Sequence, residues 1–338
     1  MPKHEHANIP IFIPHLGCPN DCVFCNQRTI SGHTDFCAEG VKNEIETALS
    51  TLGDRRAEIA FFGGSFTGID RGLMVYLLDL AQSYVDAGRV SGIRLSTRPD
   101  YIDGEIVDIL KKYTVNAVEL GVQSTSDRVL SACRRGHTRE ATVRAFALLT
   151  EAGFSVVGQM MVGLPGADAE SELQTARDIC RWGAKGARVY PTVVFYKTAL
   201  CELARAGEYT PLSDEDAAKR AAAVLDVFDK AGVKVIRVGL CASENLASES
   251  EVYAGANHPA VGELSMNELY LMRICEELDR VKNGINSLTV WVAPGCLSKA
   301  VGQKRRNIAA IREKYGINQI KILEKNGIIG YNIELEYN

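Results

Sequence analysis

The sequence lacks any apolar run near the ~18 residues that a membrane-spanning helix requires, and its start, Met1-Pro2-Lys3-His4-Glu5, is not a signal peptide. A cytoplasmic protein without a membrane partner is therefore expected. Because the cytoplasm is reducing, ten cysteines without a secretion signal favour thiols that serve metals or catalysis over disulfides. The net charge of −4 gives no overall nucleic-acid signature, so any such site must be local.

The chain of 338 residues, 46% of them hydrophobic, is long enough for a sizeable core. Apolar strand-like runs alternate with helix-like segments, and the runs are 9–13, 58–62, 92–97, 117–122, 155–161, 187–190 and 233–238. Such alternation predicts parallel strands joined by helical crossovers. Because six or seven strands can be counted, we expect an α/β fold, a partial (β/α)6 TIM-type barrel. Its chemistry should lie at the carboxyl ends of the strands.

Three cysteines, Cys18, Cys22 and Cys25, lie within eight residues in a loop that follows the first predicted strand. Three thiols can hold three metal positions of a compact inorganic centre. Tetrahedral zinc and a fully ligated iron–sulfur cluster both require a fourth ligand. The nearby candidates are His15, His33 and Cys37. The triplet alone leaves zinc, a cluster with one open iron, and unligated thiols as alternatives.

Small or hydrogen-bonding residues follow several of the predicted strands. They are Gly63-Gly64-Ser65, Ser96-Thr97-Arg98, Gln123-Ser124 and Gly163-Leu164-Pro165-Gly166. Glycines let the backbone approach a ligand, and hydroxyls and amides suit a ribose or an amino-acid head group. Any one of these sites is more readily a simple turn. Four of them on one rim, beside a metal loop, predict a small polar cofactor next to the metal.

With these blocks in order, the chain resembles the radical S-adenosylmethionine enzymes over about residues 8–240. The spacing of the three cysteines, with aromatic Phe24 before the last, is similar to the cluster loop of that superfamily. More narrowly, the chain resembles the branch that contains Elongator protein 3. The matching blocks are 61–68, 96–100, 119–124, Arg135-Gly136-His137 and Tyr190-Pro191-Thr192.

The resemblance implies a 4Fe-4S cluster with three irons bound by Cys18, Cys22 and Cys25, and a fourth iron chelated by S-adenosyl-L-methionine. An electron, delivered by a flavodoxin or a ferredoxin, then splits the S–C5′ bond and releases a 5′-deoxyadenosyl radical. By motif position, the methionine end should contact Gly63, Gly64 and Ser65, and the ribose or carboxylate should lie near Ser96, Arg98 and Gln123. Ser65 departs from the family pattern, which often has Glu there.

The segment from 285 to 338 is a different kind of unit. The stretch Gly302-Gln303-Lys304-Arg305 between two predicted helices resembles the G-x-x-G loop of a K-homology RNA-binding module, which clamps a nucleotide backbone. Between residues 297 and 325, eight Lys or Arg stand against two Glu, a local excess of +6. A solvated basic helix is the bland alternative. We predict RNA contacts at Lys299, Gly302, Gln303, Lys304, Arg305 and Arg306.

The predicted organisation is a radical enzyme barrel at 1–240, a connecting loop and helix at 241–284 and a K-homology-like domain at 285–338. Elongator-type relatives carry an acetyltransferase domain for which this chain is expected to be too short. The predicted function is modification of a nucleotide in structured RNA, with rRNA preferred to tRNA and methylation of a base carbon as the leading reaction. Two alternatives stay open. One is a radical enzyme acting on a small metabolite or tetrapyrrole, and the other is a non-enzymatic RNA-binding protein with a structural metal.

Seven cysteines lie outside the triplet, and they form no second compact set, which disfavours an auxiliary cluster. Cys241 follows the last predicted barrel strand, where a thiol can accept a methyl group or form a nucleobase adduct. A partly buried spare thiol is the competing interpretation. Cys201 and Cys296 are weaker candidates for the same catalytic role.

Overall fold

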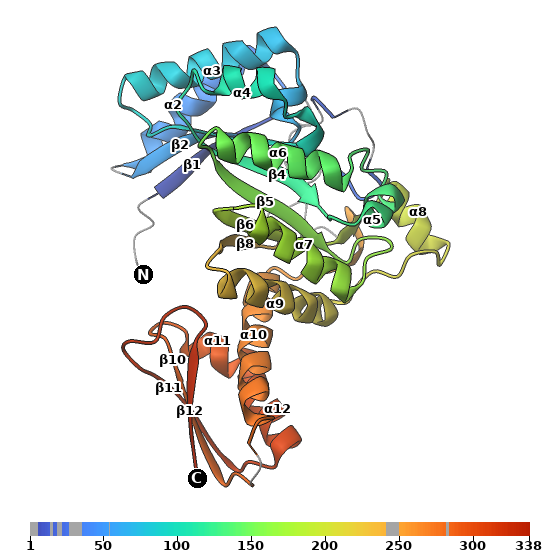
Figure 1. The fold of residues 1–338 in the computed structure, drawn as a ribbon, viewed down its shortest axis with the longest axis vertical. Helices are drawn as coiled ribbons and strands as arrows, with labels where there is room; N and C mark the ends of the chain where they lie inside the picture. Colours follow the sequence, from blue (N-terminus) through green and yellow to red (C-terminus); the bar gives the residue numbers. More distant parts are fainter. Residues whose placement is uncertain are drawn as a thin grey trace.

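The structure, a computed structural model, describes residues 6–13, 16–18, 22–26, 36–53, 55–240, 250–281 and 284–338. Its centre is a parallel sheet of seven strands whose spatial order, β1-β2-β3-β4-β5-β6-β8, follows the chain (Figure 1). The strands are β1 His6–Phe12, β2 Arg56–Phe62, β3 Ile93–Thr97, β4 Val115–Gln123, β5 Ser155–Val162, β6 Gly186–Pro191 and β8 Lys234–Val238. The sheet curls into an open barrel, so the predicted α/β partial barrel is confirmed.

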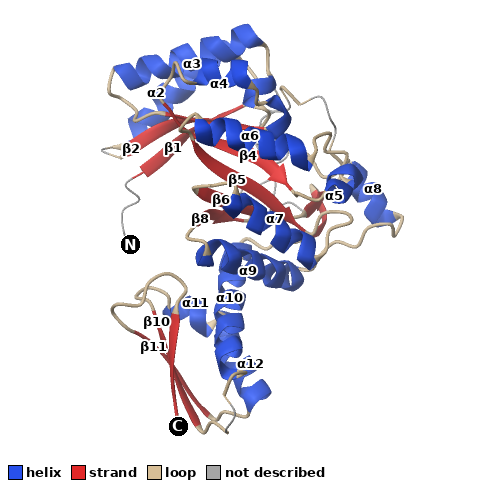
Figure 2. Cartoon of the chain, viewed as in Figure 1, coloured by secondary structure: helices blue, strands red, loops and turns tan. Residues whose placement is uncertain are grey.

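Helices cover one face of this sheet (Figure 2). They are α2 Val41–Leu52, α3 Arg71–Asp86, α4 Gly104–Leu110, α6 Arg139–Glu151, α7 Ala169–Arg181 and α9 Asp214–Lys230. Two short helices, α5 Asp127–Ala132 and α8 Ala199–Arg205, lie beyond the carboxyl ends of the strands (Figure 2). Side chains that accept hydrogen bonds from the first helical turn fix where several of them begin. Asp70 accepts from the amide of Leu73 at 2.9 Å, and Asp103 accepts from Ile106 at 2.8 Å. Between each of these two helices and the strand before it lies a short loop with a 3-10 turn, Phe66–Gly68 or Pro99–Tyr101.

The core lies between the sheet and this helical layer. Ile59, Leu95 and Val118, from three neighbouring strands, are fully buried in one cluster. They pack in that cluster with Leu77 of α3 and Phe146 of α6. Burial of this apolar face fixes the register of the strands, and with it the position of the loops at their carboxyl ends.

Two short strands form an antiparallel ribbon beside the barrel. They are β7 Val193–Phe195 and β9 Val252–Gly255. The sequence analysis did not predict this ribbon. Leu240, at the end of the barrel, packs with Val193 and Phe195. The ribbon therefore forms part of the barrel wall next to the end of β6.

The carboxyl-terminal unit has a three-stranded sheet in the order β11-β10-β12. Its elements are α10 Val261–Leu278, β10 Ser287–Val292, α11 Leu297–Val301, α12 Arg306–Tyr315, β11 Gln319–Glu324 and β12 Ile333–Tyr337. Tyr270 and Ile274 of α10 are buried with Leu288 and Ile311 in its core. The helix predicted within the connection at 241–284 corresponds to α10, and it packs in this core. Within the described ranges, no helix combines the length and apolar character needed to cross a bilayer.

Candidate active site

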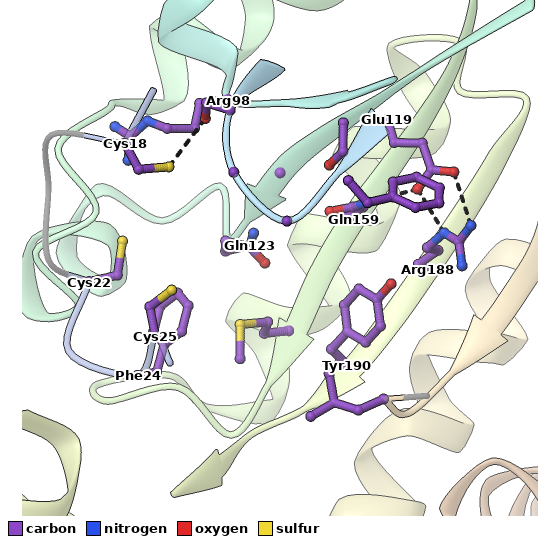
Figure 3. A pocket seen from close by; sticks show the side chains of 18 of the residues that line it. Cys18, Cys22, Phe24, Cys25, Arg98, Glu119, Gln123, Gln159, Arg188 and Tyr190 are labelled. Atoms are coloured by element: carbon purple, nitrogen blue, oxygen red, sulfur yellow. Dashed lines mark hydrogen bonds and ion pairs between the residues drawn. The ribbon is translucent and has the colours of Figure 1, made fainter. Parts of the chain in front are cut away.

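A cavity of about 290 Å³ opens at the carboxyl ends of the barrel strands (Figure 3). The nine residues that the sequence predicts for cluster and cofactor binding all line it. They are Cys18, Cys22, Cys25, Gly63, Gly64, Ser65, Ser96, Arg98 and Gln123. The curvature of the sheet brings together segments that are more than 100 residues apart in the chain. These placements leave the role of each residue as a prediction.

The three cysteines of the triplet face this cavity as free thiols. Cys18 Sγ lies 3.4 Å from Ser65 Oγ, which ties the cysteine loop to the end of β2. Among the described residues, no three His, Cys, Asp or Glu side chains gather closely enough to hold a single metal ion. Three thiols that line one cavity can instead each bind a different iron of a cubane cluster.

The alternative fourth ligands do not join the triplet. Cys37 is exposed, and its Sγ lies 3.2 Å from Glu39 Oε2 instead of lining the cavity. His15 and His33 lie outside the described residues. Among the described residues, the cavity therefore offers three thiols without a fourth His or Cys ligand.

Glycines allow the cysteine loop to lie against the loop that follows β2. The Ser65 amide donates to Leu16 O at 3.1 Å. A Cβ atom at Gly64 would lie 2.3 Å from Leu16 O and 2.6 Å from Ile13 O, both of them backbone atoms. Gly17 has a φ of +70°, and a Cβ there would lie 2.3 Å from Ser65 O. Side chains at either position would separate the two loops.

Arg98 is a buried cation in the wall of the cavity, with only 2% of its surface exposed. Its Nε and Nη2 donate to the carboxylate of Asp100 at 3.0 and 2.7 Å. Burial opposes the charge, but the bonds to Asp100 outweigh it and raise the pKa of Arg98. Nη1 is buried and has no partner among the described residues. A ligand carboxylate would satisfy that nitrogen.

Gln123 ends β4 in a conformation that glycine normally adopts, with a φ of +63°. The β4–β5 register shifts between Gly121 and Gln123, which turns the Gln123 side chain toward the cavity (Figure 3). Its Oε1 is buried without a hydrogen-bond partner in the described structure. Backbone strain and an unsatisfied amide oxygen at one residue are typical of a ligand site.

Sequence reasoning did not identify Arg135 as a site residue, although it marked the block 135–137 as part of the resemblance. The side chain is buried in the cavity wall. Its Nη2 donates to Gly121 O at 2.9 Å, and its Nη1 lies 3.5 Å from Cys22 Sγ. Arg135 and Cys22 are 113 positions apart in the chain, so their contact could not be predicted from the spacing of motif residues.

A second group that the sequence did not reveal is an ion-pair network in the barrel. Glu119 is fully buried, and Arg188 binds it through Nε at 2.7 Å and Nη2 at 3.0 Å (Figure 3). Gln159 Nε2 donates to the same carboxylate at 2.7 Å, and Arg94 Nη1 lies 3.2 Å from it. Glu119, Gln159 and Arg188 line the cavity. They give the cavity a polar part of its wall, to which Phe24, Tyr190 and Phe195 add aromatic side chains.

The other cysteines that were considered for catalysis are not among the lining residues. Cys201 is buried in an apolar cluster with Leu164 and Leu200, and Cys296 packs against the carboxyl-terminal core. These positions place neither thiol at the cavity. Cys241 lies outside the described residues.

The predicted RNA loop departs from the K-homology pattern, because its fourth residue is Arg305 and not glycine. Lys304 and Arg305 nevertheless have φ values of +51° and +61°, in the left-handed region that glycine favours. Both side chains are exposed, as is Gln303, while Gly302 is buried and Lys299 is half-buried. The loop thus presents two adjacent cations on a strained turn.

Arg306 behaves differently from its neighbours. It forms ion pairs with Glu215 of α9 and, at 3.3 Å, with Glu268 of α10. Crossover helices begin where strands end, so Glu215, in the first turn of α9, lies at the carboxyl edge of the barrel. Arg306, a predicted RNA contact, therefore forms ion pairs within the protein. These ion pairs connect the loop 302–305, which we call the basic loop, to the edge of the barrel that carries the cavity.

Comparison with known families identifies the class of this fold and cavity. The radical SAM superfamily model matches residues 12–179, and the radical SAM C-terminal domain model matches residues 184–273. The chain belongs to the radical SAM superfamily, whose members use a 4Fe-4S cluster and S-adenosylmethionine.

Relatives place the chain in the branch similar to Elongator protein 3. An uncharacterized protein of Methanocaldococcus jannaschii is 29% identical over 226 residues, which are 63% of this chain and 69% of that protein. A tRNA uridine(34) acetyltransferase of the same organism is 34% identical over 132 residues, 38% of this chain but 24% of its own length. Human Elongator complex protein 3 is 30% identical over 60% of this chain and 37% of its own length. This chain thus matches 24% to 37% of the length of those two larger relatives.

Solved structures share the fold. The archaeal Elp3 of Methanocaldococcus infernus superposes with a TM-score of 0.62 at 21% identity, covering 81% of this chain and 63% of that one. Streptococcus suis SuiB bound to S-adenosylmethionine has a TM-score of 0.51 at 12% identity, covering 72% and 52%. At these identities the likeness concerns the fold alone.

The lining residues suit the cofactor pair chemically. Three thiols leave one iron of a cubane cluster without a protein ligand. The unpartnered Nη1 of Arg98 suits a carboxylate, and the unpartnered Oε1 of Gln123 suits a hydroxyl or amino donor. A cluster held by Cys18, Cys22 and Cys25, beside a cofactor held by the other six residues, is compatible with this cavity.

Proposed function

We propose that the protein is a radical SAM enzyme that modifies a nucleotide in RNA, and that the RNA is a tRNA. The observation that carries the proposal is the cavity. It is lined by the nine predicted site residues, which include the cysteine triplet, and by the polar side chains of Glu119, Gln159 and Arg188. The relatives named for tRNA uridine(34) support tRNA over the rRNA that the sequence favoured. The basic loop tethered to the same edge of the barrel supports a polyanionic substrate over a small metabolite.

The cofactor pair, when bound, supplies a 5′-deoxyadenosyl radical. The residues of this chain hold the reactants and exclude water. Gly63 and Gly64 let the backbone approach the cofactor, while Arg98 and Gln123 offer it polar partners. The half of the cavity with Glu119, Gln159 and Arg188 is left for the target base, whose amide edge can exchange hydrogen bonds with these side chains. Tyr190, which lies beside Arg188, offers an aromatic ring to the same base (Figure 3).

The group installed stays a prediction, with methylation of a base carbon as the leading reaction. Among the lining residues that the structure describes, Cys18, Cys22 and Cys25 supply all the thiols. Of the three candidate catalytic cysteines, Cys201 and Cys296 do not line the cavity, and Cys241, outside the described residues, stays the candidate for a methyl-carrying thiol. The electron donor, a flavodoxin or ferredoxin, stays a prediction too, as do the domain boundaries at 240 and 284.

The proposal is tested in two steps. Reconstituted protein with dithionite and S-adenosylmethionine should form 5′-deoxyadenosine, and Cys22→Ala should not. Mass spectrometry of tRNA and rRNA nucleosides, from cells with and without the protein, should then show one modified nucleoside lost from tRNA. A loss from rRNA would redirect the proposal to that RNA. Unchanged nucleosides in both pools, together with cofactor cleavage, would favour the small-metabolite alternative.

RNA binding by the basic loop is tested separately. The double variant Lys304→Glu and Arg305→Glu should weaken tRNA binding strongly and flatten its salt dependence, because two cations become anions. Binding that resists both changes would remove the carboxyl-terminal unit from the proposal while leaving the radical chemistry intact.

A further inference from the structure

Two tyrosines and an arginine form a partly exposed cluster at the end of the two-stranded ribbon. The rings of Tyr196 and Tyr253 meet edge to face, with 5.6 Å between centroids. The guanidinium carbon of Arg205 lies 5.7 Å from the first ring and 5.5 Å from the second. Tyr253 is 37% exposed and the Arg205 side chain 50% exposed. We call these three residues the rim cluster.

The rim cluster is continuous with the wall of the cavity. Tyr196 directly follows Phe195, which lines the cavity, and its amide donates to Glu251 O at 3.0 Å beside β9. Tyr196 packs in the same apolar cluster as Phe24, the residue beside the third cysteine. The amide of Leu200 in α8 donates to Val23 O at 2.8 Å. The helix that carries Arg205 is thereby fixed to the cysteine loop.

A strained lysine lies next to the rim cluster. Lys197 is exposed and has a φ of +62°, between Tyr196 and the helix-capping Thr198. A residue without glycine's freedom rarely adopts this conformation, and such positions concentrate at functional sites. Lys197 and Arg205 add two cations to the exposed aromatic surface, although Glu202 pairs with Arg205 at 3.0 Å.

We propose that the rim cluster is a stacking platform for an unpaired RNA base next to the nucleotide whose base enters the cavity. The inference rests on the proposed function, because it takes RNA as the substrate. Every nucleobase has a face that stacks on an aromatic ring or a guanidinium plane, so such a platform holds RNA without reading its sequence. Lys197 and Arg205 then neutralise the adjacent phosphates. A base flipped into the cavity needs its neighbours held in this way, because flipping removes its own stacking.

The platform also lies along the route from the cavity to the basic loop. From Tyr253 the chain continues through 256–260, where the amide of His258 donates to Asp214 at the start of α9 at 2.9 Å. Asp214 adjoins Glu215, the partner of Arg306. A continuous line of contacts thus runs from the rim cluster through α9 to Arg306, next to the basic loop, and the proposed RNA segment would follow this line.

The experiment uses the reconstituted holoenzyme and fluorescence anisotropy with labelled tRNA. Tyr253→Ala should bind roughly 5- to 100-fold more weakly, the loss expected from one base stack. Tyr253→Phe keeps the ring and should bind like the wild type. Tyr76→Ala, on α3, is the matched control, because Tyr76 is also exposed, at 49%, and belongs to no cluster described above. Because Tyr253 carries no charge, the slope of log Kd against log salt should not change.

A stacked base gives a second readout. A tRNA with 2-aminopurine beside the target nucleotide should lose fluorescence on binding wild-type protein, and the loss should be smaller with Tyr253→Ala. Equal affinity of Tyr253→Ala and Tyr76→Ala, in a protein that binds tRNA, would overturn the platform and leave the proposed function standing. A wild-type holoenzyme that does not bind tRNA would overturn the proposed substrate and the platform together. Circular dichroism and the thermal midpoint identify any variant that has lost its fold.

Discussion

The guanidinium of Arg135 lies against the thiol of Cys22, with 3.5 Å between Nη1 and Sγ. Its other terminal nitrogen donates to Gly121 O at 2.9 Å, just before β4 turns toward Gln123. Arg135 therefore links a cysteine of the predicted cluster to the strand that supplies a predicted cofactor contact. Burial of the side chain, 7% exposed, keeps its charge close to that sulfur.

Replacing Arg135 should change the redox behaviour of the cluster more than its assembly. A hydrogen bond from a cation stabilises the reduced, more negative cluster and so raises its potential. Arg135→Gln should lower the potential by on the order of 60 mV, the equivalent of about 1.4 kcal/mol for one electron. An electron paramagnetic resonance titration of the reduced cluster measures this. Arg135→Lys keeps the charge, so its cluster potential should lie between those of the wild type and Arg135→Gln. A potential unchanged in both variants would contradict a contact with the cluster.

Gly64 should not tolerate even the smallest side chain. A Cβ at that position would lie 2.3 Å from Leu16 O, and a backbone atom cannot rotate out of the way. Gly64→Ala should therefore displace the cysteine loop and reduce iron and sulfide content and 5′-deoxyadenosine formation by at least about tenfold. Gly104→Ala, at the start of α4, is the control, because a Cβ atom there would meet no neighbouring atom within 4 Å. Full iron content in Gly64→Ala would show that the two loops can separate without consequence.

The position of a residue at the cavity was predictable from the sequence where it lies at the carboxyl end of a strand. Ser96, Arg98 and Gln123 follow that rule, because parallel strands bring their carboxyl ends to one edge. The contacts of Arg135 with Cys22 and of Glu119 with Arg188 were not predicted, because the two residues of each pair are far apart in the chain and meet only in the folded sheet. The ribbon of β7 and β9 was missed because strands of three and four residues have no clear periodicity.

The carboxyl-terminal unit shows a different limit. The order of its elements after α10 follows the predicted order, and the excess of basic residues was visible in the sequence. The sequence could not assign Arg306 to Glu215 and Glu268, because an arginine within a basic run looks the same whether it faces solvent or a carboxylate. Charge patterning locates a surface, but the partners depend on the packing of α9, α10 and α12.

Gln123 should matter more to the cofactor than to the fold. Its Oε1 is buried without a partner among the described residues, so the amide contributes little to stability. Gln123→Met should leave the free energy of unfolding within about 1 kcal/mol of the wild type. It should weaken S-adenosylmethionine binding by roughly tenfold, the loss of one hydrogen bond. Calorimetry on the cluster-loaded protein measures the affinity. A loss of stability without a loss of affinity would assign Gln123 to the fold instead.

The cations in and next to the basic loop should differ in their effect on RNA binding: Lys304 and Arg305 should contribute to it, and Arg306 should not. Arg305→Gly removes a charge and suits the φ of +61°, so it should keep the fold while weakening tRNA binding and reducing the salt slope by about 1. Arg306→Ala breaks partly exposed ion pairs, each worth about 1 kcal/mol or less, and should leave the affinity nearly unchanged. Anisotropy across a salt series compares the two variants. A larger loss with Arg306→Ala would restore it as an RNA contact.

His137 should make the stability of the protein depend on pH near neutrality. Burial, together with the charges of Arg135 and Arg98, lowers the pKa of His137 from 6.5 to about 3, although Asp100 opposes the shift. Below pH 6.5 the imidazole of His137 is protonated in the unfolded chain but stays neutral in the folded protein. The contribution of His137 is therefore complete above pH 6.5 and is lost progressively as the pH falls toward 3.

The loss should approach about 1.4 kcal/mol for each pH unit well below 6.5. Urea unfolding at about pH 7.5, 6.5 and 5.5 should thus show a falling free energy for the wild type and a flatter profile for His137→Gln. His258→Gln, at an exposed position, should follow the wild type. The window lies above the ordinary carboxyl range, so Asp100, whose pKa is lowered, does not contribute to the slope. Parallel profiles for all three proteins would mean that His137 takes up its proton in the folded state as easily as in the unfolded chain.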